Sequence, residues 1–222
     1  MSGGPAAPGR YVPAPGFRWL TPFYDAVVRL TTRERAFKQA LLDQAGLAAG
    51  QHVLDLACGT GTMMIWAKQR FPALRLTGLD GDADVLSRAR AKAQAAGFEI
   101  TFDEGFSTSL PYPDGRFDRV LSSLFFHHLD RDGKQRTLAQ AFRVLKPGGE
   151  LHVADWGRAA NPPMRMAYFG IQLLDGFDNT ADNVNGLLPE FMRAAGFANV
   201  VETRHFSTMW GTMSLFRATR PA

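Results

Sequence analysis

Two acidic residues at the ends of apolar runs are the groups in this sequence best suited to binding a nucleoside. The first run, residues 53–56, contains Asp55 and leads into small residues up to Gly61. The second run ends on Asp80, about 20 residues after the small residues. A carboxylate at the end of a second strand can accept charge-assisted hydrogen bonds from both ribose hydroxyls. The alternative role of Asp80 is to cap the next helix, which Asp82 could do equally well. We expect Asp55 to organise the turn or to hold a water near an amino group of the ligand.

The turn between the two runs consists of small residues, namely Ala57, Cys58, Gly59, Thr60 and Gly61. Such residues let the backbone and the following helix approach a ligand closely. The pyrophosphate-binding spacing G-x-G-x-x-G is not met, because Ala57 stands where a first glycine could be. The turn therefore favours a cofactor without a pyrophosphate, and glycines that serve only the turn itself are the alternative.

Several motifs in chain order resemble class I S-adenosylmethionine-dependent methyltransferases, and among them the small-molecule enzymes of ubiquinone and menaquinone biosynthesis. They are D-x-x-C-G-T-G at 55–61, Gly-Leu-Asp at 78–80, and the segments 110–118, 122–129 and 143–149. The resemblance implies S-adenosylmethionine as cofactor and S-adenosylhomocysteine as product. It also implies an α/β, Rossmann-like sheet of seven strands in the order 3-2-1-4-5-7-6. The last strand is antiparallel, helices cover both faces, and a helical cap precedes the sheet.

Composition narrows the class of protein further. The chain has 222 residues, of which 45% are hydrophobic and 21% charged, which suits one globular domain. The net charge of +4 comes from scattered Lys and Arg, so a nucleic-acid partner is disfavoured. The single Cys58 excludes an internal disulfide, and no metal-ligand spacing occurs. The sequence has no apolar run of transmembrane length and no export signal, so we expect a cytoplasmic protein.

Alternating strand and helix patterns predict how the chain is organised. Residues 1–16, rich in Gly, Pro and Ala, are expected to form a flexible tail before a single domain at 17–222. Within the domain we expect cap helices at 17–46, a cofactor-binding core at 50–155, an acceptor segment at 160–190 and a hairpin at 197–220. Strands are predicted near 52–57, 74–80, 98–102, 117–123, 149–155, 199–205 and 212–219. Tyr24 in the cap either reaches the methionine end of the cofactor or packs against the sheet.

The expected adenine site departs from the family pattern. Relatives often carry Gly-Asp-Ala before Leu-Pro, where the acid accepts from the adenine amine, but here Phe106 follows Gly105. Either the base stacks on Phe106 while Glu104, Ser107 or a backbone carbonyl supplies the polar contact, or Asp103 replaces the acid. Together with Gly81 and Ser122, these positions complete the expected cofactor contacts.

The segment after the fourth strand lies where the methyl group should meet its acceptor. His127 or His128 could remove a phenolic or enolic proton near neutral pH, and a structural role for both is the alternative. Asp155 and Asp175 are secondary candidates for acceptor contacts. The sequence predicts methyl transfer to oxygen or carbon of a small quinol-like, phenolic or enolic molecule.

Residues 162–188 carry more apolar side chains than one packing face requires. An apolar or amphipathic acceptor, a homodimer contact or simple core packing would each explain the surplus. Two other functional classes remain open at this point. One is a methyltransferase that modifies RNA or protein, and the other is an adenosyl-binding scaffold without activity.

Overall fold

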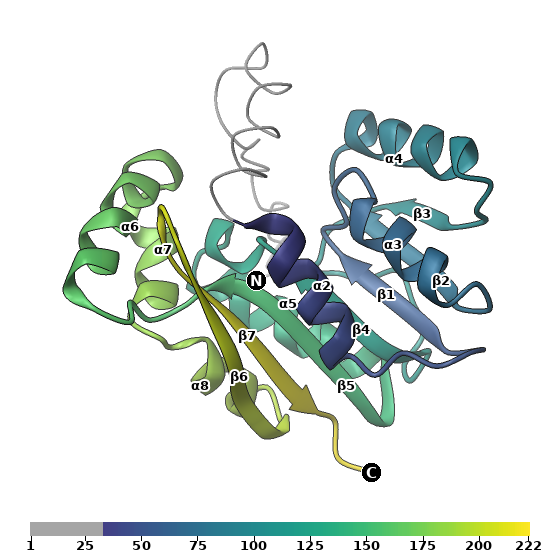
Figure 1. Ribbon diagram of the computed structural model, residues 1–222. Coiled ribbons are helices and arrows are strands. Elements are labelled where there is room, and N and C mark those ends of the chain that lie inside the picture. The colour runs from purple at the N-terminus through teal and green to yellow at the C-terminus, as the bar shows by residue number, and fades with distance from the viewer. Residues whose placement is uncertain (1–32) are drawn as a thin grey trace, which may run out of the picture.

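One seven-stranded sheet organises the chain, in the order β3-β2-β1-β4-β5-β7-β6 (Figure 1). The computed structural model describes residues 33–222, apart from the side chains of residues 170, 171, 173–175, 177 and 178. The strands are β1 (His52–Leu56), β2 (Arg75–Asp80), β3 (Thr101–Glu104), β4 (Phe117–Ser123), β5 (Leu145–Trp156), β6 (Ala198–Thr208) and β7 (Gly211–Thr219). The helices are α2 (Glu34–Gln44), α3 (Thr62–Arg70), α4 (Ala83–Ala95), η2 (Phe126–His128), α5 (Arg131–Val144), α6 (Pro162–Asp175), α7 (Phe177–Val184) and α8 (Leu188–Ala194). The predicted tail at 1–16 and the expected contact of Tyr24 lie outside the described residues.

The direction of the strands confirms the predicted fold class. Strands β1 to β5 pair in parallel, whereas β7 runs antiparallel to both of its neighbours, β5 and β6. The turn between β6 and β7 precedes Gly211, as the sequence predicts. The carboxyl ends of the parallel strands therefore meet at one edge of the sheet, where ligands bind in folds of this kind.

Three strands differ from their predicted bounds by three residues or more, and one of them, β6, continues to Thr208 rather than ending near 205. The third strand starts at Thr101 rather than near residue 98, because the Phe98 N–H still closes the end of α4 on the Ala93 carbonyl at 3.0 Å. The fifth begins early, since Leu145 already pairs with Phe117 before a shift of register. The third strand also ends at Glu104 rather than near 102, directly before Gly105 and Phe106. The carboxyl ends of β1, β2 and β4 lie within one residue of their predicted places.

The sheet is buried between two layers of helices. Helices α2, α3 and α4 share one apolar cluster with Val53, while α5 and α8 share another with Leu54 and Leu56. Successive side chains of a strand point to opposite faces. Asp55 therefore projects to the same face as Val53, where the side chains of α3 cover it.

Helices α6 and α7 lie beyond the carboxyl end of β5 (Figure 1). Tyr168 of α6 is buried, and its ring packs on Trp156 at the end of β5 with 5.5 Å between ring centroids. The segment expected to face the acceptor thus adjoins the sheet edge. None of the helices in residues 33–222 is long and apolar enough to cross a membrane.

Candidate active site

The turn after β1 is held in an unusual backbone conformation. Ala57, Gly59 and Gly61 have φ angles of 55°, 54° and 70°, which lie in the left-handed region. That region is strained for alanine, and strain of this kind clusters at functional sites. A side chain at Gly61 would approach the Phe102 ring to 3.1 Å, so a small residue is needed there as α3 begins.

Two side chains of the turn, those of Thr60 and Cys58, have different environments. Thr60 accepts a hydrogen bond from the Lys92 ammonium of α4 at 2.7 Å. Cys58 is buried, and burial beside Asp55 and Asp80 raises the pKa of its thiol. A neutral, buried thiol is a poor nucleophile, so Cys58 fills space behind the turn.

Asp80 joins the turn to the end of β2. Its Oδ2 accepts from the Gly59 N–H at 2.9 Å and its Oδ1 from the Asp82 N–H at 3.1 Å. Burial raises the pKa of Asp80, although these N–H donors oppose the shift. Capping of α4 is performed by Asp82, whose side chain accepts from the N–H groups of Asp84 and Val85. Asp80 is thus a half-buried carboxylate at the edge of the sheet that the helix does not use as its cap.

Three of the residues expected near adenine gather beside Asp80. The Gly105 N–H donates to the Asp80 carbonyl at 3.0 Å. Phe106 is 50% exposed, and its ring lies 3.5 Å from where a Cβ on Gly81 would stand. An exposed phenyl ring next to this turn is available for stacking on a planar base.

The polar groups around Phe106 have separate tasks. Asp103 accepts a hydrogen bond from the Tyr112 hydroxyl at 2.9 Å. Ser107 is buried and pairs with the Thr137 hydroxyl of α5 at 2.8 Å. Asp103 Oδ2 and the Ser107 hydroxyl thus already have protein partners, whereas Asp103 Oδ1, Glu104 and the backbone carbonyls remain candidates to accept from an amine.

Asp55 lies behind the turn rather than on its surface. It is 2% exposed, and no protein group within the described residues hydrogen-bonds to its Oδ1. Burial raises the pKa of Asp55 to about 7, which the Lys38 ammonium counteracts. A cavity of about 10 Å³ adjoins it and is otherwise lined by apolar side chains. This volume is at the lower limit for one water, and Asp55 is its only polar lining residue, so Oδ1 is a buried acceptor without a protein partner among the described residues.

Ser122, expected among the cofactor contacts, is placed inside the sheet. It is fully buried and donates to the Leu56 carbonyl of β1 at 3.2 Å. Its hydroxyl therefore links β4 to β1, and the surface of the acceptor side is formed by later residues.

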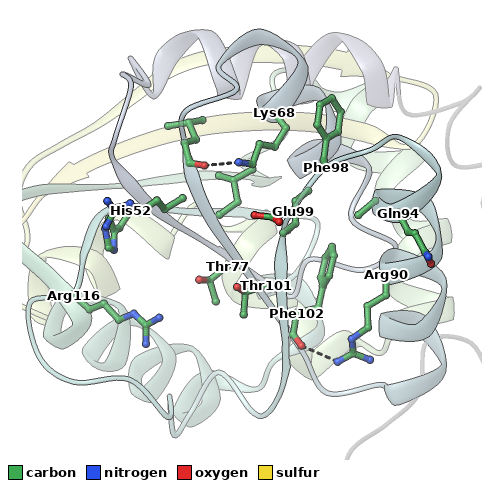
Figure 2. A pocket seen from close by; sticks show the side chains of 15 residues that line it. His52, Lys68, Thr77, Arg90, Gln94, Phe98, Glu99, Thr101, Phe102 and Arg116 are labelled. Atoms are coloured by element: carbon green, nitrogen blue, oxygen red, sulfur yellow. Dashed lines mark hydrogen bonds between the residues drawn. The ribbon is translucent and has the colours of Figure 1, made fainter.

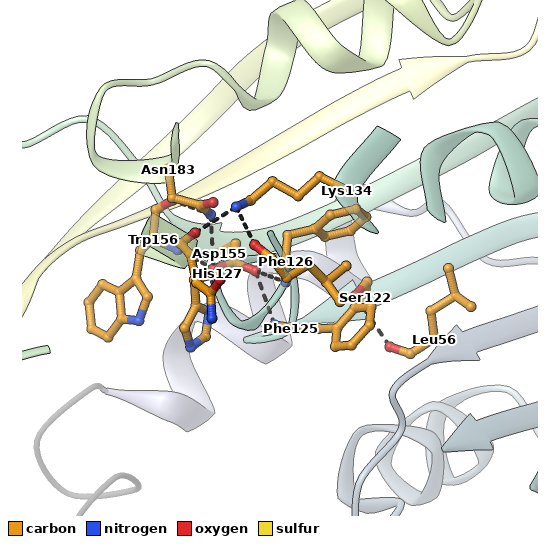
Figure 3. Close-up of polar contacts among 11 residues, drawn as sticks. Leu56, Ser122, Phe125, Phe126, His127, Lys134, Asp155, Trp156 and Asn183 are labelled. Carbon is orange, nitrogen blue, oxygen red and sulfur yellow. Dashed lines mark hydrogen bonds and ion pairs between the residues drawn. The ribbon is translucent and has the colours of Figure 1, made fainter. Parts of the chain in front are cut away.

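Asp155 organises the segment after β4 (Figure 3). Its Oδ2 accepts from the N–H groups of Phe125 and Phe126 at 3.0 and 2.6 Å. Its Oδ1 lies 2.7 Å from the Nδ1 of His127 and accepts from the Trp156 N–H at the same distance. Complete burial by itself would raise the pKa of Asp155, but His127 and the Trp156 N–H hold it below its usual range. Asp155, considered from sequence for an acceptor contact, instead anchors the loop and one histidine.

The two histidines have different environments. Asp155 at Nδ1 makes Nε2 the lone-pair nitrogen of a neutral His127. The His128 ring lies 3.9 Å from that of His127, centroid to centroid. Burial, together with His127, lowers the pKa of His128 to about 3. His127 is therefore the better candidate for a base at neutral pH, because a group of pKa near 3 binds a proton too weakly.

Helix α7 is hydrogen-bonded to the segment around Asp155 and, through Lys134, to the end of η2. Asn183 donates to the Trp156 carbonyl at 3.2 Å and lies 3.4 Å from Asp155 Oδ1. The buried ammonium of Lys134 donates to the carbonyls of Leu129 and Asn179, each at 2.6 Å. Sequence reasoning missed both Lys134 and Asn183. The polar residues of 178–183 within an otherwise apolar segment were the signal that could have indicated them.

Asp175 and possible metal ligands are the remaining candidates from the sequence. Asp175 ends α6, and its side chain is outside the described part of the chain. No group of three or more His, Cys, Asp or Glu side chains in the described residues could hold a metal ion.

Comparison with known proteins agrees with this geometry. A family model described as a methyltransferase domain matches residues 53–149. The chain is 32% identical over 174 residues to a demethylmenaquinone methyltransferase of Thermus thermophilus, covering 78% of this chain and 76% of the relative. A ubiquinone/menaquinone biosynthesis C-methyltransferase of Roseobacter denitrificans is 35% identical over 136 residues, which cover 60% and 54%.

Solved structures share the fold at low sequence identity. An O-methyltransferase family protein of Burkholderia thailandensis has a TM-score of 0.70 at 20% identity, covering 91% of this chain and 59% of that one. Phosphoethanolamine N-methyltransferase 2 of Haemonchus contortus, solved with S-adenosylmethionine, has a TM-score of 0.68 at 17% identity, covering 84% and 53%.

The fold and the site thus define a class I methyltransferase that uses S-adenosylmethionine. Within that class, the chain belongs to the branch of the ubiquinone and menaquinone biosynthesis methyltransferases. Both the predicted enzyme class and the predicted cofactor are confirmed.

Proposed function

We propose that this enzyme methylates an oxygen or carbon atom of a small, largely apolar quinol-like, phenolic or enolic acceptor, with His127 as the base. The names of the Thermus and Roseobacter relatives support an acceptor related to quinones. The observation that carries the proposal is the 2.7 Å contact between His127 Nδ1 and Asp155 Oδ1 next to the sheet edge.

The residues present suit S-adenosylmethionine, which supplies an electrophilic sulfonium methyl group when bound. Asp80 would hold the ribose hydroxyls, and the backbone from Ala57 to Gly61 would line the methionine portion. Asp55, whose Oδ1 has no protein partner among the described residues, suits the cofactor's ammonium group, directly or through one water. Phe106 would stack on adenine, in place of the acid that relatives use.

A base is required because phenolic and enolic acceptors carry a proton that must leave as the new bond forms. Asp155 fixes the orientation of His127 and would stabilise the imidazolium formed after proton transfer. His127 Nε2 takes the proton from the acceptor oxygen. For a carbon acceptor, loss of the enolic proton would raise electron density at the adjacent carbon, which would take the sulfonium methyl group and leave S-adenosylhomocysteine. The hydrogen on that carbon would then leave as a proton, which restores the enol.

Exposed apolar side chains support a nonpolar acceptor. Met166 and Phe169 on α6 are 79% and 51% exposed, and Met209 in the turn after β6 is 67% exposed. Tyr168, on the inner side of the same helix, contacts Trp156, whose ring is 6.4 Å from that of His127. A row of ring contacts thus runs from His127 through Trp156 to Tyr168 of α6, the helix that carries Met166 and Phe169.

The test is a methyl-transfer assay with a panel of quinols and phenols, carried out on His127→Ala, His128→Ala and the unaltered enzyme. His127→Ala should lower turnover by about 10²–10⁴-fold, the usual contribution of a general base. His128→Ala should change turnover far less, and titration calorimetry should give similar S-adenosylmethionine affinities for all three proteins. Near-normal turnover in both variants would reject His127 as the base and leave proximity alone as the source of catalysis.

A further inference from the structure

A cationic groove lies at the amino-terminal edge of the sheet, opposite the edge that carries the candidate active site (Figure 2). Lys68, Arg75, Arg90 and Arg116 contribute four positive charges to its lining, and Glu99 contributes the one carboxylate. The groove has a volume of about 640 Å³. That volume falls within the range of small-molecule sites.

Part of the groove lies where one crossover of the sheet lacks a helix, and Lys68 and Arg90 extend its lining from α3 and α4. In the described structure the other parallel crossovers carry α3, α4 and α5, but residues 105–116 between β3 and β4 form none. His52 is the register partner of Arg75, and Thr77 that of Thr101. Because register partners project to the same face, these side chains form a polar surface where a helix would otherwise lie.

The four positive charges at the groove have no ion-pair partner in residues 33–222. None of the four cations has a carboxylate oxygen within 4.0 Å among the described residues. Lys68 and Arg90 donate to the carbonyls of Leu74 and Phe102, both at 2.7 Å.

The two remaining guanidinium groups make different contacts. Arg75 Nη1 lies 3.0 Å from His52 Nε2, and the Arg116 guanidinium stands 5.1 Å from the centroid of the Tyr112 ring. Most of the N–H donors of Arg75 and Arg116 therefore remain available, and the planar guanidinium fork matches phosphate oxygens.

We propose that this groove binds a small phosphorylated molecule, with the guanidinium groups of Arg75 and Arg116 donating hydrogen bonds to the phosphate. The hydroxyls of Thr77 and Thr101 supply further donors on the floor of the groove (Figure 2). Because the groove is at the edge of the sheet opposite Asp80, the ligand is separate from the cofactor and the acceptor. The proposal does not depend on the identity of the methyl acceptor.

His52 provides a direct spectroscopic probe of this site. Its Nε2 faces the Arg75 guanidinium, and burial together with the charges of Arg75, Lys146 and Arg116 lowers the pKa of His52, while Asp118 opposes them. A bound phosphate adds negative charge next to the imidazole, so it should move the His52 titration to higher pH.

The experiment is an NMR titration of the full chain with inorganic pyrophosphate, following the His52 ring signals over a range of pH. We expect saturable shifts and a higher titration midpoint of His52 when pyrophosphate is present. Arg75→Gln and Arg116→Gln should each weaken binding by about tenfold, since each removes a charge-assisted hydrogen-bond donor. Arg75→Lys should weaken it less, because it keeps the charge but loses the fork.

Arg136→Gln is the matched control, because Arg136 is an exposed arginine of α5 that pairs with Asp132 at 2.7 Å. It should leave pyrophosphate affinity unchanged, and every variant should bind S-adenosylmethionine normally if it is folded. A flat titration at millimolar pyrophosphate would overturn the proposal, as would equal weakening by Arg136→Gln. Binding to phosphatidylglycerol vesicles that requires Arg75 and Arg116, without binding of pyrophosphate, would reassign the groove to a lipid surface.

Discussion

The two halves of the candidate active site are built in different ways. The cofactor half depends on backbone conformation over a few consecutive residues, Ala57 to Gly61, and on one carboxylate that accepts from Gly59. The acceptor half depends on side chains from separate elements, with His127 on η2, Asp155 on β5 and Asn183 on α7. A site of the first kind is set by local sequence, whereas one of the second kind exists only after the domain has folded. Substitutions in the two halves should therefore have separable effects, on cofactor affinity in one and on turnover in the other.

The largest effect on cofactor affinity is expected at Asp80. Asp80→Ala removes the acceptor for the ribose hydroxyls and also releases the Gly59 N–H, so S-adenosylmethionine affinity should fall by at least about 100-fold. Titration calorimetry measures this directly. Asp82→Ala is the neighbouring control, because it removes the cap of α4, with a loss of about 1 kcal/mol in stability, but no proposed cofactor contact. Equal loss of affinity in both variants would show that the turn responds to helix stability rather than to a specific carboxylate.

Asp155→Asn should produce the corresponding loss in the acceptor half. An amide can keep accepting from the N–H groups of Phe125 and Phe126, but its NH₂ group then faces His127 and places the proton on Nε2. A base with the wrong tautomer should lower turnover by about 10²–10⁴-fold while cofactor affinity stays constant. Steady-state assays beside calorimetry separate the two quantities. Turnover within a factor of about two of normal would exclude a role for this pair in proton transfer.

The third prediction concerns the dependence of stability on pH. The pKa of Asp55 is about 7 in the folded protein and 3.8 when unfolded. Its contribution to the free energy of unfolding is therefore complete at low pH and is lost as the pH rises from about 4 to 7. Asp55→Asn should remove this loss and stabilise the cofactor-free protein at pH 8 by up to about 4 kcal/mol. Urea unfolding at a series of pH values gives the comparison. Parallel profiles for variant and unaltered protein would mean that Asp55 is already ionised and paired in the folded state.

The smallest effect is expected at Phe106. Phe106→Ala removes an exposed ring beside Gly81, and the lost stacking should weaken S-adenosylmethionine binding by about tenfold. Phe106→Tyr, which keeps the ring, should bind normally. Unchanged affinity in the alanine variant would leave Glu104 or a backbone carbonyl as the contact to adenine.

This contrast also explains which features the sequence predicts. The turn and Asp80 follow directly from residue order, because glycines placed straight after an apolar strand allow the left-handed backbone that such a turn needs. The strand order follows from the family resemblance. The contact of His127 with Asp155 joins residues 28 positions apart, and that of Lys134 with Asn179 joins residues 45 apart, so no local pattern encodes either. The inward position of Ser122 likewise depends on the neighbouring strand, whose Leu56 carbonyl it meets.

The position of Asp155 has a consequence for how acceptor preference can evolve. One fully buried carboxylate holds both the loop and the proposed base, and none of its hydrogen bonds within the described residues involves α6. Met166 and Phe169 on the outer side of α6 can therefore be exchanged without disturbing the proton-transfer pair. A lineage, or an engineer, could diversify α6 for new acceptors while Asp155 keeps the reaction chemistry constant.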